Sequence, residues 1–228
     1  MFFSPTYLMY MIPAFILMAL TSWYVKSAYN KWSRVQAQSR LTGAQAAQRL
    51  MSTGNLYGVQ IQGTAGNLTD HYDPRDKTLY LSQGVANVAS VASVAIAAHE
   101  LGHALQDAED YFPLRVRSAL VPVVNIGSNF GWILIMIGLF LRFTELAWLG
   151  VLIFAGGAVF ALFTLPVEFN ASARAKQLLV QTGIIQTDEE QRGVNAVLNA
   201  AALTYVAGLV TAILQLLYYA SLVGGRRR

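Results

Sequence analysis

Four long apolar segments constrain the fold of this chain more than any other feature of its sequence. None of them contains a charged residue, and they occupy residues 7–25, 122–141, 146–166 and 200–223. Each is long enough for an α-helix to cross the hydrocarbon core of a bilayer, which needs about 20 apolar residues. The whole chain is only 12% charged, against about 25% for a typical soluble domain. We therefore predict a mostly α, multi-pass protein of the cell membrane with about four transmembrane helices.

A charged motif lies between the first two apolar segments and reads His99-Glu100-Leu101-Gly102-His103. On an α-helix, a spacing of four residues advances about 6 Å and turns about 40° past a full revolution, so both imidazoles project from one face. They can hold one metal ion, while Glu100 is placed to take a proton from a metal-bound water rather than to bind the ion. The pattern is typical of zinc hydrolases. The plainer interpretation is two helical histidines beside an unrelated glutamate.

The third metal ligand has to come from elsewhere in the chain, because a catalytic zinc ion needs three protein ligands and an open position for water. There is no cysteine and no histidine after position 103, so the ligand is a downstream carboxylate or the upstream His71. Glu145 lies between the second and third apolar segments and would face the opposite side of the membrane. Glu168 follows the third segment and would emerge on the same side as the motif. We predict that the two motif histidines and Glu168 hold one Zn²⁺ per chain; alternatively, Glu168 pairs with Arg174 along a helix.

The region between the first two apolar segments is expected to contain short elements. These are a helix that begins after Thr42 and ends at Gly54, strands over 57–62 and 78–82, a polar loop over 67–76, and a tightly buried helix over 85–98. The loop contains His71. It is either a solvated turn built on its Asp-Pro pair or a loop folded over the active site.

The basic residues indicate the organisation and orientation of the chain. We expect a first transmembrane helix over 1–25, a catalytic region over 26–117, a transmembrane hairpin over 118–166, a helical region with the third ligand over 167–199, and a fourth transmembrane helix with a basic tail over 200–228. The two large loops contain nine and three Lys or Arg residues, whereas the hairpin contains one and the tail three. This bias places both large loops in the cytoplasm. The arginines of the tail contradict the rule unless the last segment does not cross fully.

Five short blocks of sequence occur in a specific order along nearly the whole chain. They cover residues 68–74, 81–82, 97–106, 165–172 and 201–205. In content and order they resemble the bacterial neutral zinc metallopeptidases of the YugP type. More distantly, the chain is similar to membrane gluzincins of the HtpX and CAAX-prenyl protease type. The resemblance implies a small α+β, gluzincin-like catalytic region and a membrane-embedded zinc endopeptidase. In those gluzincins the third ligand belongs to a Glu-x-x-x-Asp pattern; here Ser172 replaces the aspartate, so the support of Glu168 must differ.

The predicted reaction is peptide-bond hydrolysis by a zinc-activated water, with Glu100 as the general base. His71, Asn170 and Arg174 are candidates for the donor that stabilises the oxyanion. If residues 79–82 form an edge strand, they would pair with the backbone of an extended or unfolded peptide substrate.

Two other functions are compatible with the motif. A non-catalytic membrane assembly factor would have a closed structural metal site, with His71 or Asp107 as its fourth ligand. Asp107 could otherwise accept a hydrogen bond from a ligand imidazole or lie at the solvated end of its helix. A metal transporter would need ligands inside its spans, and these segments contain no acid or histidine. The net charge of +4 is not a nucleic-acid signature, so the expected partners are the lipid bilayer and a protein or peptide substrate.

Overall fold

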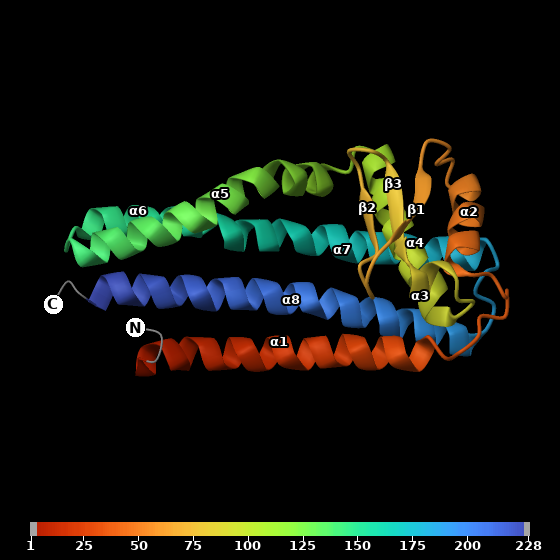
Figure 1. Cartoon of the computed structure of the whole chain (residues 1–228), viewed down its shortest axis with the longest axis horizontal. Helices are drawn as coiled ribbons and strands as arrows, with labels where there is room; N and C mark the ends of the chain where they lie inside the picture. The colour runs from red at the N-terminus through yellow and green to blue at the C-terminus, as the bar shows by residue number, and fades with distance from the viewer. Residues whose placement is uncertain (1–3, 226–228) are drawn as a thin grey trace. The chain divides into compact units, whose positions relative to one another are not determined.

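The computed structural model describes residues 4–225 and is mostly helical, with one small sheet (Figure 1). The predicted mostly α membrane fold with a small α+β region is confirmed. The elements are α1 (Pro5–Trp32), α2 (Gly43–Thr53), β1 (Gln60–Thr64), β2 (His71–Asp73), β3 (Thr78–Ser82), α3 (Gln83–Ala86), α4 (Val91–Ala108), α5 (Phe112–Phe140), α6 (Thr144–Phe154), α7 (Gly156–Gln181) and α8 (Asp188–Gly224). The basic tail predicted at 226–228 lies outside the described residues.

Four helical stretches are long and apolar enough to cross a membrane. They are Pro5–Trp32, Phe112–Phe140, Thr144–Gln181 and Asp188–Gly224. All four begin before the apolar segments from which they were predicted, because the preceding residues continue the helices. The third stretch consists of α6 and α7, which are separated at Ala155, and it continues through Pro166 into the helical region expected over 167–199.

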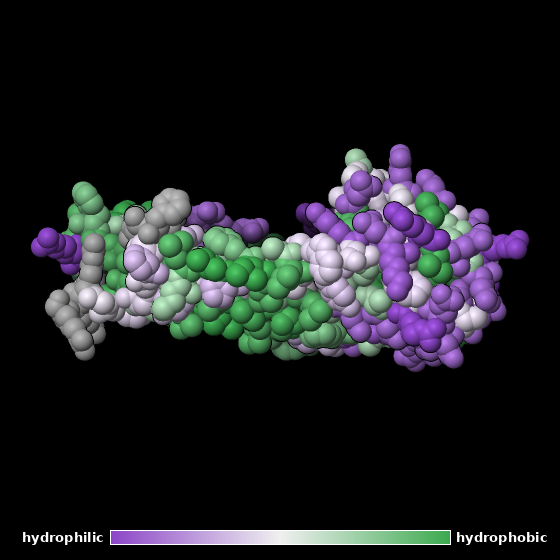
Figure 2. Space-filling view, turned by 90° about the horizontal axis from the view of Figure 1, so that it is seen from below, coloured by the Kyte–Doolittle hydropathy of each residue, from purple (hydrophilic) through white to green (hydrophobic). Residues whose placement is uncertain are grey.

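The described chain divides into two compact units. The first, the membrane unit, contains residues 4–22, 115–166 and 204–225. Its helices pack through small residues: Gly131 faces Gly150 so closely that a β-carbon at position 131 would lie 2.9 Å from the Gly150 carbonyl oxygen. Ile135 is fully buried in the core of this unit. Figure 2 shows a largely hydrophobic surface over these helices, as expected for side chains solvated by lipid.

The second unit, the motif unit, contains residues 23–114 and 167–203. Its sheet has the strand order β1-β3-β2, with β1 parallel and β2 antiparallel to β3. The predicted strand over 78–82 is confirmed, and the strand predicted over 57–62 is observed slightly later. Two predictions are wrong. Residues 71–73 form β2 rather than loop, because β3 supplies hydrogen-bond partners that turn composition cannot reveal, and residues 79–82 lie in the central strand rather than at an edge.

Helix α2 forms as its sequence predicts. Thr42 accepts a hydrogen bond from the backbone N–H of Gln45, and the Gln45 side chain accepts one from the Thr42 N–H, which makes a capping box. Gly54 ends the helix. The apolar face, which includes the fully buried Leu50, packs into the core of the motif unit.

Helix α4 carries the His-Glu-x-x-His motif and starts later than predicted. The expected continuous helix over 85–98 is wrong, because α3 ends at Ala86 and Ser90 caps a new helix by accepting a hydrogen bond from the Ser93 N–H at 3.1 Å. Fourteen of the 18 residues of α4 are buried, and ten of the 18 are Ala, Val, Ser or Gly. Small side chains let neighbouring elements pack closely around the motif.

Candidate functional site

The site forms where α4 meets the second half of α7. A β-carbon at Gly102 would lie 2.5 Å from the carbonyl oxygen of Ala171, so the two backbones are almost in contact. Only glycine permits this approach. Glu168 precedes Ala171 by about one helical turn, and its side chain lies next to the two motif histidines.

Three buried side chains converge at this crossing. The Nε2 atoms of His99 and His103 lie 3.2 Å and 3.6 Å from the same oxygen, Oε2 of Glu168. One potential ligand atom from each residue lies within 4.8 Å of the others. The three residues are 8%, 9% and 1% exposed, respectively. The structure thus brings together the residues predicted to bind the metal, from positions that are 69 residues apart in the case of His99 and Glu168.

The other ring nitrogen of each histidine has its own partner. Nδ1 of His99 lies 3.2 Å from the Ser172 hydroxyl, and Nδ1 of His103 lies 3.0 Å from Oε1 of Gln106. When Nδ1 donates to these oxygens, the Nε2 lone pairs of both rings point toward Glu168. Two imidazole nitrogens and one carboxylate oxygen form a donor set that suits zinc and leaves a coordination position open. The residues therefore fit the ion, and Ser172 supports His99 rather than Glu168.

Glu100 follows His99 on α4 and is 9% exposed. Burial raises the pKa of its carboxyl group, because the surrounding protein disfavours the charged form, although the nearby imidazoles oppose this effect. A carboxylate with a raised pKa is a better proton acceptor than a solvated one. Its position and environment thus suit a general base.

Arg174 engages protein partners on α4 and α7. Its Nε donates to Oδ1 of Asn170 at 2.7 Å, and its guanidinium forms an ion pair with Glu109 at 2.7 Å. This contact lowers the pKa of the Glu109 carboxyl group, because the adjacent positive charge favours the ionised form. The alternative for Glu168 was a salt bridge with Arg174 along one helix. Arg174 instead pairs with Glu109, which lies directly after α4. Contact of Arg174 or Asn170 with an oxyanion stays a prediction.

His71 lies in β2, and its side chain is exposed. It is not a member of the cluster formed by His99, His103 and Glu168. Its ring stacks on Tyr80 with 4.8 Å between centroids, and its Nδ1 lies 2.8 Å from the Thr69 carbonyl oxygen. Its predicted catalytic role is not supported by a contact within the cluster and stays a prediction.

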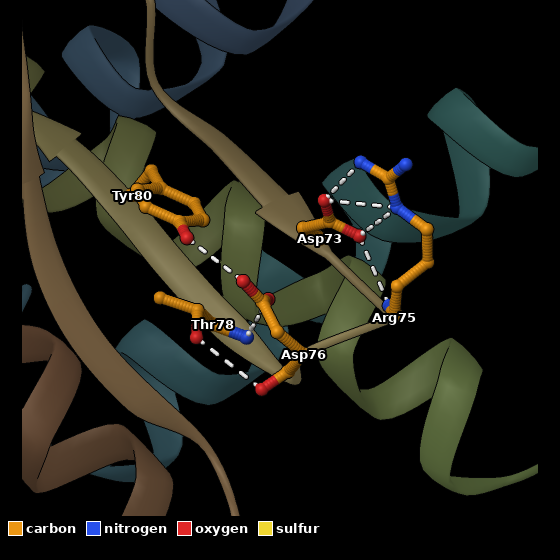
Figure 3. Close-up of polar contacts among 5 residues, drawn as sticks. All are labelled: Asp73, Arg75, Asp76, Thr78 and Tyr80. Atoms are coloured by element: carbon orange, nitrogen blue, oxygen red, sulfur yellow. Dashed lines mark hydrogen bonds and ion pairs between the residues drawn. The ribbon is translucent and has the colours of Figure 1, made fainter.

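The turn between β2 and β3 fixes the ring on which His71 stacks (Figure 3). The carboxylate of Asp73 binds the backbone and guanidinium of Arg75, while Asp76 accepts from the Tyr80 hydroxyl at 2.8 Å and from the Thr78 N–H at 3.1 Å. The hydrogen bonds from Arg75 lower the pKa of Asp73 to about 2. The carboxylates of Asp73 and Asp76 therefore stabilise the turn.

Two further side chains near the motif differ from expectation. Asp107 accepts a hydrogen bond from the Tyr72 hydroxyl at 2.9 Å, so it links β2 to α4 instead of supporting a histidine or lying in solvent. Gln106 supports His103 instead. Sequence reasoning missed Gln106, although a polar residue three positions after a helical histidine lies on the same face and was a usable signal.

The sequence of the chain is similar to those of known proteins. The sequence profile of a family described as "Putative neutral zinc metallopeptidase" matches residues 7–224. A protein of Bacillus subtilis (strain 168), described as "Putative membrane protease YugP", is 45% identical over 195 residues, which is 86% of each chain. No solved structure gave a significant match.

Proposed function

Because the chain belongs to the neutral zinc metallopeptidase family, we propose that it is a membrane-embedded endopeptidase. In this proposal His99, His103 and Glu168 bind one zinc ion per chain, and Glu100 is the general base. The observation that carries it is the convergence of both Nε2 atoms on one buried Glu168 oxygen, next to a buried acid that is not part of the cluster.

The open position of the proposed site favours catalysis over a structural role. A closed structural site would need a fourth protein ligand. The two candidates are otherwise engaged, since Asp107 binds Tyr72 and His71 stacks on Tyr80. The alternative of a non-catalytic assembly factor is therefore the weaker one.

Each residue has a distinct task in hydrolysis. Zinc, when bound, lowers the pKa of a water ligand and polarises the carbonyl group of the peptide bond. Ser172 and Gln106 orient the two imidazoles through their Nδ1 atoms. Glu100 takes the proton released by the attacking water and passes it to the leaving amine.

The substrate is proposed to be an extended or unfolded peptide segment. The backbone of such a segment can add to an outer strand of a sheet. Since β3 is central, the strand that would pair with substrate is β2, which is an outer strand and is linked to α4 through Tyr72. Residues 26–117 and 167–199 are proposed to face the cytoplasm on the basis of their excess of Lys and Arg.

The proposal is tested by comparing the membrane proteomes of cells that express the wild-type protein or Glu100→Gln. A substrate should accumulate only with the variant, because the variant retains the metal ligands and loses the base. Identical proteomes, together with full activity of the variant on an unfolded reporter, would refute the mechanism.

A further inference from the structure

Gln106 is a buried, uncharged side chain beside the proposed metal centre, and its amide is used at both ends. It is 0% exposed. Its Oε1 faces Nδ1 of His103 at 3.0 Å, and its Nε2 donates to the Val167 carbonyl oxygen at 2.8 Å and to Asn170 Oδ1 at 2.9 Å. A buried amide costs free energy when its polar atoms are left unpaired, and here both ends are paired.

The partners of Gln106 determine which way its amide points. A backbone carbonyl can only accept a hydrogen bond, so it has to face the NH₂ group. The carbonyl end of the amide is then directed at His103. Because that oxygen carries no proton, the Nδ1 of His103 must carry one, and its Nε2 is left facing Oε2 of Glu168 at 3.6 Å.

The orientation of Asn170 is determined in turn by Arg174. A guanidinium group has donors and no acceptor, so the oxygen of the Asn170 amide has to face Arg174 Nε, at 2.7 Å. The same oxygen accepts from Gln106. Arg174 is itself held by Glu109 and lies over the Tyr111 ring, 5.9 Å from its centroid.

We propose that Arg174, Asn170 and Gln106 form a directional hydrogen-bond network that keeps Nδ1 of His103 protonated and turns its Nε2 toward Glu168, where a metal ion would bind. These three are positioning residues, since they act through His103. The identification of the ion as zinc rests on the proposed function; the protonation of Nδ1 does not. This hydrogen-bond network gives Arg174 a role that needs no contact with substrate.

The test uses the full-length protein in detergent and the variant Gln106→Met, which keeps the length of the side chain and removes both hydrogen-bonding ends. Two quantities are measured: which ring nitrogen of His103 carries a proton, with Nδ1 as the diagnostic atom, by nitrogen NMR of ¹⁵N-histidine in metal-free protein, and the Zn²⁺ dissociation constant, by competition with a chelator. The spectrum is tractable because the chain has three histidines. The matched control is Gln177→Met, the same change on an exposed face of α7.

Wild type and the control should show His103 protonated at Nδ1. Gln106→Met should show less proton on Nδ1, because the acceptor at Nδ1 is lost while Glu168 still faces Nε2. Its dissociation constant should rise about 10- to 100-fold, the range for lost support of a metal-binding histidine. Arg174→Met, at a side chain 21% exposed, should shift the protonation of Nδ1 in the same direction and raise the dissociation constant less, because it acts through two intermediates.

Unchanged protonation of Nδ1 in Gln106→Met overturns the proposal. If that variant does not fold, unchanged protonation in Arg174→Met does so. Neither measurement requires proteolysis. A wild-type protein with His103 protonated at Nδ1 and no peptidase activity would therefore count against the proposed function and leave this inference standing. An active peptidase in which Gln106→Met leaves the protonation of His103 unchanged would contradict this inference and leave the proposed function standing.

Discussion

Gly102 of α4 and Ala171 of α7 lie so close that a β-carbon on the glycine would stand 2.5 Å from the alanine carbonyl oxygen. This contact determines how far Glu168 lies from His99 and His103, since α4 and α7 supply the three clustered residues. The glycine within the His-Glu-x-x-His motif is thus a packing residue of the proposed metal centre.

Replacing Gly102 by valine should therefore separate α4 from α7. The branched side chain meets backbone atoms, which cannot move aside as a flexible side chain would. We expect a large loss of stability, on the order of 3 kcal/mol for overpacking a buried contact, and a loss of metal binding in whatever protein folds. Thermal unfolding and zinc content measure the two effects. Gly58→Val, where a β-carbon meets nothing within 4 Å, is the control and should be close to wild type.

Glu100→Gln should retain zinc and lose proteolysis. The amide occupies the same volume and cannot accept the proton, and the three proposed ligands are untouched. Removal of a general base lowers the rate by about 10²- to 10⁴-fold. Cleavage of an unfolded reporter and metal analysis of the same preparation give both values. A variant with wild-type turnover would exclude Glu100 as the base.

Glu168→Ala should lower the zinc content of purified protein, because it removes the carboxylate on which both imidazoles converge. Mass spectrometry of the metal in washed protein measures the effect. Glu189→Ala, on the first turn of α8, is a suitable control. Unchanged metal in Glu168→Ala would refute its assignment as the third ligand.

The turn between β2 and β3 should weaken in acid. The pKa of Asp73 falls from its usual 3.8 to about 2 in the folded chain, because Arg75 binds the carboxylate. A lowered folded-state pKa means that this contribution to stability is fully present above pH 3.8 and is lost as the pH falls toward 2. In Asp73→Asn, the backbone amide proton of Arg75 should thus exchange with solvent faster than in the wild type at neutral pH. The difference should shrink between pH 4 and 2, as hydrogen exchange can show; an equal difference at all pH values would contradict the assignment.

The orientation in the membrane can be tested with single cysteines, since the chain has none of its own. Gly58→Cys introduces a thiol into the loop proposed to be cytoplasmic, and Phe143→Cys introduces one into the turn between α5 and α6. A membrane-impermeant thiol reagent added to intact cells should label Phe143→Cys and spare Gly58→Cys. The opposite pattern would reverse the proposed topology.

Features that depend on local sequence could be predicted, whereas features that depend on contacts distant in sequence mostly could not. The spans were predictable because each apolar segment is long and free of charge, and α2 because its capping box is local. The convergence of Glu168 on the histidines was predicted by elimination among the remaining acids. Its role as a ligand stays a prediction.

The missed features depend on partners that are distant in sequence. The strand β2 forms against β3, and its own composition indicates a turn. Gln106 acquires its role from Val167 and Asn170, which lie 61 and 64 residues further along the chain. The local sequence could place Gln106 on the same helical face as His103, but it could not show these distant partners or the pairing of β2 with β3.

The donor set of the proposed centre consists of two imidazoles and a carboxylate, with no sulfur. Thiolate zinc sites lose their metal when peroxide oxidises the cysteines. The same oxidant has no comparable target among His99, His103 and Glu168. The proposed centre should therefore retain a bound zinc ion under oxidative conditions that strip zinc from cysteine-rich proteins.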